Sequence, residues 1–228
     1  MPTLLEISQP DVISAEWTDA PESPRFAPRQ IHVWRAWLDD PRLLALSSDV
    51  LALCEIVEAE RCVSSLERDR QLAMRGFLRD VLARYVGASP HELRFTRDRA
   101  GRLSLALSTL HFNFCHAENV ALVAVAPYGE IGLELEHVRD DLPFDEMAAH
   151  FFEPEHHWGI RTTLCHTQKA RKFFDCWTTT EASLQAVALR READAEPVCV
   201  HRICPAESYL AALAVVANEP QFALWNWC

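Results

Sequence analysis

The sequence predicts an α+β (α/β) fold made of two halves, because strand-like and helix-like patterns follow one another twice along the chain. A strand, helices and further strands occupy residues 31–127, and strands, helices and strands follow in residues 128–228. With 228 residues, 49% of them hydrophobic and 24% charged, the chain has an ordinary globular composition. A chain of this size can bury one large core or two smaller ones.

The chain begins with a proline-rich segment that predicts an extended leader over residues 1–30. Its prolines are Pro2, Pro10, Pro21, Pro24 and Pro28. Alternation of apolar and polar residues over Ile31–Leu38 predicts the first strand. Leucines at helical spacing then predict a helix over Pro41–Leu53.

The strongest helix signal begins at Ser64, which stands three residues before Glu67 as in a capping box. Apolar side chains recur four residues apart behind it, as in the series Phe77, Val81 and Tyr85. Gly87 is typical of the position just after a helix, so we predict that the helix ends there. The polar face of this helix carries Arg68, Arg75, Arg79 and Arg84.

Short strands and helices are predicted for the rest of the chain. Ser89–Glu92 has the signature of a short helix, and a hairpin follows with Gly101 at its turn. The expected strands cover residues 93–96, 103–107, 111–115, 120–126, 131–138, 198–203, 209–217 and 222–227. The expected helices cover residues 144–152, 154–158 and 169–190, the last with Phe173, Phe174 and Trp177 on its buried side.

The net charge of −11 argues against a general nucleic-acid binder. Basic residues nevertheless concentrate between Arg61 and Arg102, where ten arginines accompany five acidic residues. Such a segment is either a solvated helix face or a binding site for an anionic ligand, and composition leaves both open. No apolar run is long enough to span a bilayer, and Met1–Pro10 lacks the features of a signal peptide, so we expect a cytoplasmic protein.

The cysteines and histidines give a weaker signal. The eight cysteines lack C-x-x-C spacing, so we expect reduced, buried thiols rather than a disulfide framework. Four of the ten histidines lie in one region without an H-E-x-x-H motif: His150, His156, His157 and His166. They are either zinc ligands or solvated and core histidines, and their spacing leaves both readings open.

The main candidate site lies in Ile131–Arg139, which reads as a strand of alternating apolar and acidic residues. In such a strand Glu134 and Glu136 point to one side, while Leu133 and Leu135 point to the other. Two neighbouring carboxylates repel each other unless a cation lies between them or water solvates both. The strand therefore has either a polar outer face or part of a metal site.

Three further stretches accompany this strand in a fixed order. The four segments are Phe112-Asn113-Phe114-Cys115-His116, Gly132-Leu133-Glu134-Leu135-Glu136, Phe151-Phe152-Glu153-Pro154-Glu155 and Trp177-Thr178-Thr179-Thr180-Glu181-Ala182. They resemble the F-N-x-S-H, G-x-D-x-E, F-F-x-x-E and W-x-x-K-E-A motifs of the 4′-phosphopantetheinyl transferases of the surfactin-synthetase type. The resemblance covers roughly residues 55–190.

This resemblance implies a pseudo-dimer of two similar α/β halves, with the site in the cleft between them. It implies a monomeric holo-carrier-protein synthase, which transfers the 4′-phosphopantetheine arm of coenzyme A to a serine of an apo acyl or peptidyl carrier protein. The metal would be Mg²⁺, held by Glu134, Glu136 and Glu181, and Glu181 is also the candidate base that takes the proton of the serine. The second product would be 3′,5′-ADP.

The resemblance also assigns the nucleotide phosphates of coenzyme A to basic side chains. These are Arg61, Arg75, Arg102 and His116. Arginine suits this role because its guanidinium binds phosphate oxygens in a bidentate manner. The alternative for each arginine is a solvated position on a helix or hairpin.

Several positions depart from the family pattern. Glu134 replaces an aspartate, Thr180 and Gln185 replace lysines, Cys115 replaces a serine, and Glu58 stands where a basic residue is common. The glycine-rich turn after the long helix is also missing, since residues 188–194 contain no glycine. These departures leave two alternatives to an active transferase: an impaired relative that binds or scaffolds carrier proteins, and a metal-dependent phosphohydrolase.

Overall fold

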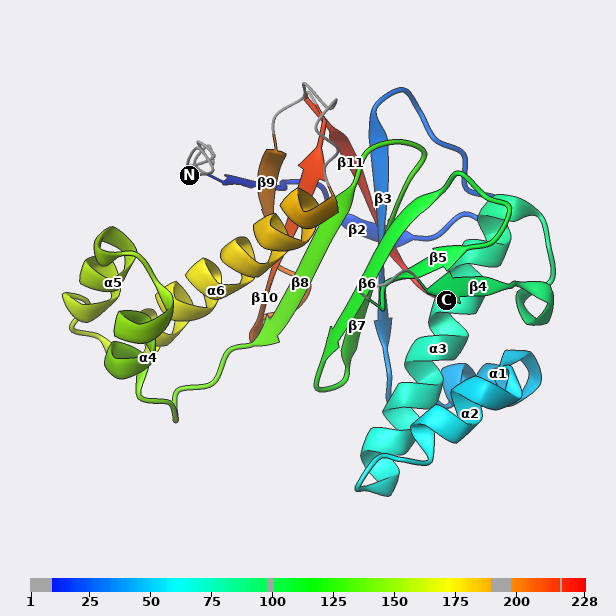
Figure 1. Ribbon diagram of the computed structural model, residues 1–228, viewed down its shortest axis with the longest axis horizontal. Coiled ribbons are helices and arrows are strands. Elements are labelled where there is room, and N and C mark those ends of the chain that lie inside the picture. The colour runs from blue at the N-terminus through cyan, green and yellow to red at the C-terminus, as the bar shows by residue number, and fades with distance from the viewer. Residues whose placement is uncertain (1–9, 98–100, 190–197, 218) are drawn as a thin grey trace. The chain divides into compact units, whose positions relative to one another are not determined.

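The computed structural model describes residues 10–97, 101–189, 198–217 and 219–228 (Figure 1). Within that part of the chain, six α-helices and three sheets form a mixed α+β structure, which confirms the predicted fold class. The chain divides into two compact units. Unit 1 comprises the described residues of Met1–Ser14 and Glu130–Asn218, and unit 2 comprises those of Ala15–Gly129 and Glu219–Cys228.

The two units differ from the predicted halves at both ends of the chain. Strand β1 (Asp11–Val12) pairs in parallel with β9 (Val198–Ile203) of unit 1, within the stretch predicted as an extended leader. Strand β11 (Gln221–Asn226) pairs in parallel with β3 (Gln30–Trp37), so the last strand completes unit 2. The relation of the halves as a pseudo-dimer stays a prediction.

Unit 1 is built on a four-stranded sheet with the order β1-β9-β10-β8. Strand β10 (Tyr209–Val216) pairs antiparallel with β9 and with β8 (Ile131–His137), which forms the edge. The long helix α6 (His166–Leu189) lies along this sheet (Figure 1). Helices α4 (Phe144–Phe151) and α5 (Pro154–Arg161) pack near its first turns, in an apolar cluster that includes the buried Phe173 and Phe174.

Gly132 allows α6 to approach β8 closely. A Cβ atom at this position would overlap the backbone carbonyl oxygen of Ala182 on α6. Ala182 and Ala186 are fully buried at this contact, so small residues line both sides of it. Because side chains two residues apart in a strand share a face, Glu134 and Glu136 lie on the same face of β8 as Gly132, which is the face toward α6.

Unit 2 is built on a five-stranded sheet with the order β2-β11-β3-β7-β6. The strands not yet described are β2 (Trp17–Asp19), β6 (His111–Ala117) and β7 (Val120–Ala126), and a separate hairpin consists of β4 (Phe95–Arg97) and β5 (Leu103–Leu105). Helix α3 (Ser65–Val86) contributes Phe77, Leu78 and Leu82 to a core that also contains Trp34. No described helix combines the length and the apolar character that a bilayer-spanning segment needs.

The capping signals of α3 are confirmed at both ends. Ser64 Oγ accepts a hydrogen bond from the Glu67 amide at 3.1 Å, and the Glu67 carboxylate accepts one from the Ser64 amide at 3.3 Å. Gly87 adopts φ of 65°, in the left-handed region that favours glycine after a helix. The short helix predicted at Ser89–Glu92 is the 3₁₀ turn η1 (Pro90–Glu92).

The single helix predicted over Pro41–Leu53 is wrong at its C-terminal end. Helix α1 covers Pro41–Val50, and a second helix, α2, covers Leu53–Ala59. Leu51 and Ala52 between them are extended, with ψ of 143° and 151°. The Glu55 carboxylate caps the second helix by accepting a hydrogen bond from the Ala52 amide at 2.9 Å. A glutamate at the third position of a helix is the sequence signal for this start, and the spacing of the leucines does not contain it.

Parts of four sequence predictions lie outside the described residues. These parts are the start of the leader at residues 1–9, the hairpin turn at 98–100, the last residue of the long helix at 190, and most of the glycine-free stretch 188–194. The other predicted strands and helices have described counterparts whose ends differ by a few residues.

We expect Gly132→Ala to destabilise the protein by about 2 kcal/mol or more, because the new methyl group must displace backbone atoms of α6. Urea titration followed by circular dichroism measures the change in the free energy of unfolding. The matched control is Gly159→Ala in α5, where a Cβ atom meets nothing within 4 Å. Equal stability of Gly132→Ala and the wild type would contradict the close contact between α6 and β8.

A buried hydrogen-bonded chain links β3 to α3 in unit 2. Trp34 Nε1 donates to the hydroxyl oxygen of Tyr85 at 2.8 Å, and His32 Nδ1 lies 2.8 Å from the same oxygen. Gln30 Oε1 lies 3.0 Å from His32 Nε2 and also accepts from the Ala27 amide. This network assigns the proton of a neutral His32 to Nε2, with Tyr85 donating to Nδ1. Burial lowers the pKa of His32 to about 4.

We expect His32 to make the stability of the protein fall as the pH falls from about 6.5 to about 4. In this range the unfolded chain takes up a proton that the folded chain cannot accept. The cost at pH 5 relative to pH 7.5 is about 2 kcal/mol. Urea titrations at both pH values should show that His32→Gln removes this part of the pH dependence, whereas His91→Gln at an exposed position retains it. An unchanged slope in His32→Gln would contradict a neutral, buried His32.

Candidate functional site

The acidic side chains of the candidate metal site lie on two elements of unit 1 that pack together. Strand β8 carries Glu134 and Glu136, and helix α6 carries Glu181. Burial raises the pKa of Glu134 to about 7, a hydrogen bond from Gln185 opposes this shift, and repulsion by Glu136 and Glu181 adds to it. Glu134 is therefore within electrostatic reach of both other carboxylates. Burial also raises the pKa of Glu136, and the charge of Arg139 partly offsets that rise.

Gln185 holds Glu134 in place. Its Nε2 donates to Glu134 Oε2 at 2.8 Å, and its Oε1 accepts from the Leu133 amide of β8 at 3.0 Å. The amide side chain therefore connects α6 both to the backbone of the edge strand and to the carboxylate. The sequence comparison with the family treated Gln185 only as a missing lysine, and its positioning contacts were not predicted. Thr180, at the other lysine position, is exposed.

The donor set of unit 1 suits Mg²⁺ only in part. Among the described residues, no group of three or more histidine, cysteine, aspartate or glutamate side chains is arranged so that it could hold a metal ion. The three glutamates, and the histidines of the α4–α6 region, are therefore not preformed ligand cages. Magnesium commonly takes only one or two carboxylates and completes its octahedron with water and substrate phosphates. Glu134 and Glu136, which share one face of β8, fit that simpler requirement.

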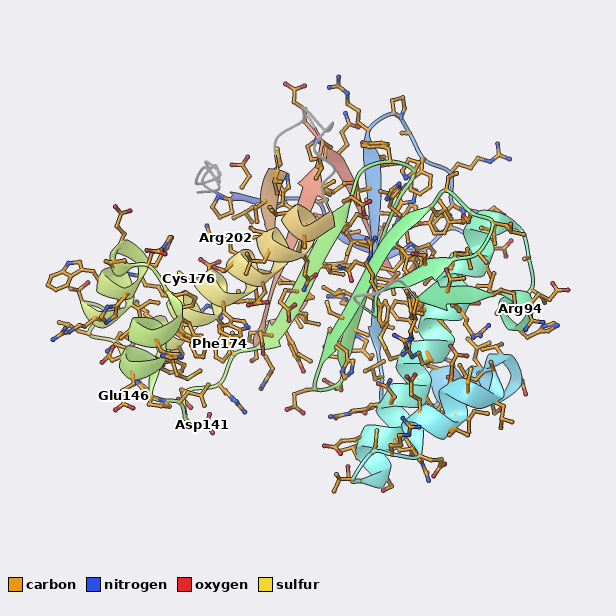
Figure 2. The ribbon with its side chains drawn as sticks, viewed as in Figure 1. Arg94, Asp141, Glu146, Phe174, Cys176 and Arg202 are labelled. Carbon is orange, nitrogen blue, oxygen red and sulfur yellow. The ribbon has the colours of Figure 1, made fainter. Side chains whose placement is uncertain are left out.

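Unit 2 contains a cavity of about 470 Å³ lined mainly by α2, α3 and the segment before and within the β4–β5 hairpin. Five arginines line it: Arg61, Arg75, Arg79, Arg94 and Arg97. Arg94, labelled in Figure 2, lies just before β4. The cavity thus brings together Arg61 and Arg75, two of the predicted phosphate-binding residues, and adds three arginines that were not singled out as phosphate ligands.

Arg75 is the buried arginine of this cavity that retains an unsatisfied donor. Its side chain is 8% exposed, and its Nε has no hydrogen-bond partner in the structure. One Nη2 contact reaches Glu58 Oε2 at 3.2 Å, and the guanidinium lies 5.4 Å from the ring centre of Phe114 on β6. Burial is the main cause that lowers the pKa of Arg75, while the charge of Glu58 opposes this. The segment that resembles F-N-x-S-H therefore contacts Arg75 through the ring of Phe114.

Arg79 has a structural role that the helix pattern did not reveal. Its Nε donates to Glu55 Oε2 at 2.8 Å, and its Nη1 donates to the carbonyl oxygens of Pro90 and Leu93 at 2.8 and 3.2 Å. The sequence placed Arg75 and Arg79 on the polar face of α3, but both are buried. A spacing of four residues, which aligns two side chains on one helix face, was the available signal.

The other two predicted phosphate ligands, Arg102 and His116, do not line this cavity. Arg102 directly precedes β5, and His116 lies at an exposed position of β6. Partial desolvation and the charge of Arg70 lower the pKa of His116. Their role toward phosphate stays a prediction.

Comparison with known proteins identifies the family. No protein-family profile matches the chain. The 4′-phosphopantetheinyl transferase HetI of Nostoc sp. is 34% identical over 180 residues, which cover 75% of this chain and 73% of that protein. The chain belongs to the 4′-phosphopantetheinyl transferase family. A Synechocystis sp. protein provisionally named a 4′-phosphopantetheinyl transferase is 28% identical over 160 residues, which cover 69% of this chain and 64% of that protein.

Membership of the phosphopantetheinyl transferase family agrees with the resemblance found in the four motifs. The surfactin-synthetase subtype within that family stays a prediction. The metal and phosphate roles of individual residues are also predictions, to which the structure adds the packing of α6 against β8 and the arginine-lined cavity of unit 2.

We expect Glu181→Gln to lower the pKa of Glu134 in metal-free protein, because the substitution removes a repelling charge. A carbon-detected NMR titration of the glutamate carboxyl groups measures this shift directly. The control is Glu155→Gln at an exposed position of α5, which should leave the pKa of Glu134 unchanged. If both variants titrate like the wild type, Glu181 does not approach Glu134.

Proposed function

We propose that this chain transfers the 4′-phosphopantetheine arm of coenzyme A to a serine of an apo acyl or peptidyl carrier protein, in a Mg²⁺-dependent reaction that releases 3′,5′-ADP. Family membership supports phosphopantetheine transfer in general. The observation that carries the specific mechanism is the packing of α6, which bears Glu181, on the face of β8 that bears Glu134 and Glu136. A decayed site would have no need to keep three repelling carboxylates on packed elements.

Glu134 and Glu136 would hold the metal ion, which, when bound, neutralises charge on the diphosphate oxygens of coenzyme A. The burial and repulsion that raise the pKa of Glu134 suit such a role, because a bound cation stabilises the ionised carboxylate against both. Gln185 keeps one carboxylate oxygen of Glu134 oriented. Its neutral amide does so without adding a second positive charge beside the metal.

Glu181 is the proposed base for the carrier serine. The serine Oγ attacks the phosphorus that bears the pantetheine arm and forms a new P–O bond, while the bond to the leaving 3′,5′-ADP breaks. The serine proton passes to the carboxylate of Glu181, directly or through a water molecule. The position of Glu181 on α6, packed against the strand that carries the other glutamates, is consistent with this assignment.

The arginines of unit 2 would bind the phosphates of coenzyme A. Arg61 and Arg94 have no described hydrogen bond or ion pair through their side chains, and Arg75 has an unsatisfied Nε. Guanidinium groups bind phosphate oxygens through short, charge-assisted hydrogen bonds. Arg102 and His116 retain their predicted roles in the same proposal. We propose that the protein acts as a monomer, because one chain supplies both sets of residues.

Two observations favour a second function, that of an impaired relative which binds or scaffolds carrier proteins. Glu58 already neutralises part of the charge of Arg75, and Thr180 and Gln185 stand at the two family lysine positions. Each lost charge-assisted contact would weaken coenzyme A binding by about 1.5–3 kcal/mol. The transferase is preferred because the carboxylates, on which the chemistry depends, are retained.

We expect incubation with coenzyme A, Mg²⁺ and an apo carrier protein to increase the intact mass of the carrier by one phosphopantetheine arm. Glu136→Ala should slow this transfer by about 100-fold or more, because it removes charge that would hold the metal ion. The control is Glu146→Ala at an exposed position of α4, labelled in Figure 2, which should transfer at the wild-type rate.

The same incubation separates the alternatives. An unmodified carrier that still binds the chain in calorimetry supports the scaffold and rejects the transferase. Release of phosphate from coenzyme A without any carrier protein supports a phosphohydrolase.

A further inference from the structure

Five arginines line the cavity of unit 2, and not all of them have a structural role. Among its five arginines, Arg79 is neutralised by the buried Glu55 and bonded to two carbonyl oxygens, so it stabilises the protein rather than a ligand. Arg61 and Arg94 are exposed and have no described side-chain partner. The cavity therefore remains available to an anionic ligand.

Glu58 is the acidic side chain that competes with such a ligand. Its Oε2 accepts from Arg75 Nη2 at 3.2 Å, and its Oε1 accepts from Arg97 Nη2 at 3.3 Å. A single carboxylate thus spans two guanidinium groups, as a phosphate group does when it binds between two arginines. Arg97 is held in this position by a second hydrogen bond, from its Nη1 to the Gly101 carbonyl oxygen at 2.8 Å.

The contacts of Glu58 are weak enough for a phosphate to displace them. Both distances exceed the 2.7–2.9 Å that is typical of short N⁺–H···O⁻ hydrogen bonds. The side chains of Glu58 and Arg97 are 43% and 47% exposed, so water screens their attraction. Glu58 also leaves Arg75 Nε without a partner in a side chain that is only 8% exposed. A ligand oxygen that reaches Nε would satisfy a buried donor that Glu58 does not.

We propose that Glu58 determines how strongly the protein selects for the phosphate groups of its coenzyme A substrate. The carboxylate occupies Arg75 and Arg97 in the free protein and repels any phosphate that approaches them. The proposal assigns the 3′-phosphate of coenzyme A to this cavity, so the chain distinguishes only weakly between coenzyme A and dephospho-coenzyme A, which lacks that phosphate. This inference rests on the proposed function, because it concerns the ligand of that reaction.

Binding of coenzyme A and of dephospho-coenzyme A to wild type and Glu58→Gln, measured by calorimetry without Mg²⁺ or carrier protein, tests this inference. Glutamine has the shape of glutamate without its charge. Because Glu58 is exposed, the variant should fold like the wild type, and thermal melting checks this. We expect Glu58→Gln to bind coenzyme A about tenfold more tightly, and dephospho-coenzyme A no more than about twofold more tightly. The wild type should bind the two ligands within about threefold of each other.

The matched control is Glu60→Gln, which removes one charge two residues away at an exposed position that does not line the cavity. An equal gain in Glu60→Gln and Glu58→Gln would reduce the effect to net charge and overturn the inference. An equal gain for both ligands in Glu58→Gln, or no gain for either, would overturn it as well.

The transfer reaction itself separates this inference from the proposed function. If the wild type modifies the carrier protein but Glu58→Gln leaves the ratio of the two affinities unchanged, the function stands and the selectivity role of Glu58 is wrong. If no variant modifies a carrier while Glu58→Gln still gains affinity for coenzyme A alone, the selectivity role stands and the proposed reaction is wrong.

Discussion

The contact between α6 and β8 at Gly132 determines where the acidic side chains of unit 1 lie. Because the helix backbone rests directly on the strand, Ala182 and Ala186 fill the contact and Glu181 is carried next to the acidic face of the strand. Gln185 then bonds to both the backbone and the carboxylate of that strand. A bulkier residue at Gly132 would move the helix and every one of these groups together. The proposed metal chemistry therefore depends on the absence of a side chain at Gly132.

The candidate site of unit 2 is basic rather than acidic, and its arginines are partly buried and partly exposed. Arg79 is fully compensated by Glu55 and backbone carbonyl oxygens, which joins α3 to α2 and to the turn before the hairpin. Arg75, one helical turn earlier, is compensated only in part and keeps an unsatisfied Nε. A buried donor without a partner costs free energy, so its presence indicates a position reserved for binding rather than for stability.

Local signals in the sequence predicted local structure well. Both ends of α3 followed from Ser64, Glu67 and Gly87, because a cap is a contact between neighbours in the chain. The position of β11 beside β3 did not follow, because parallel pairing between remote segments leaves no pattern in either one. The acidic positions of β8 and α6 were identified from motifs, but the contacts that Glu58 makes with the arginines depend on tertiary packing and were visible only in the structure.

The pairing of β11 with both β2 and β3 has a consequence for the order of assembly. The sheet of unit 2 has its early strands at residues 17–37, yet the strand that lies between β2 and β3 comes from residues 221–226. During synthesis on the ribosome, all the strands of unit 1 emerge before this gap can be filled. The sheet of unit 2, whose other strands are complete at residue 126, must therefore wait with an open edge, which is the kind of surface that chaperones cover in nascent chains.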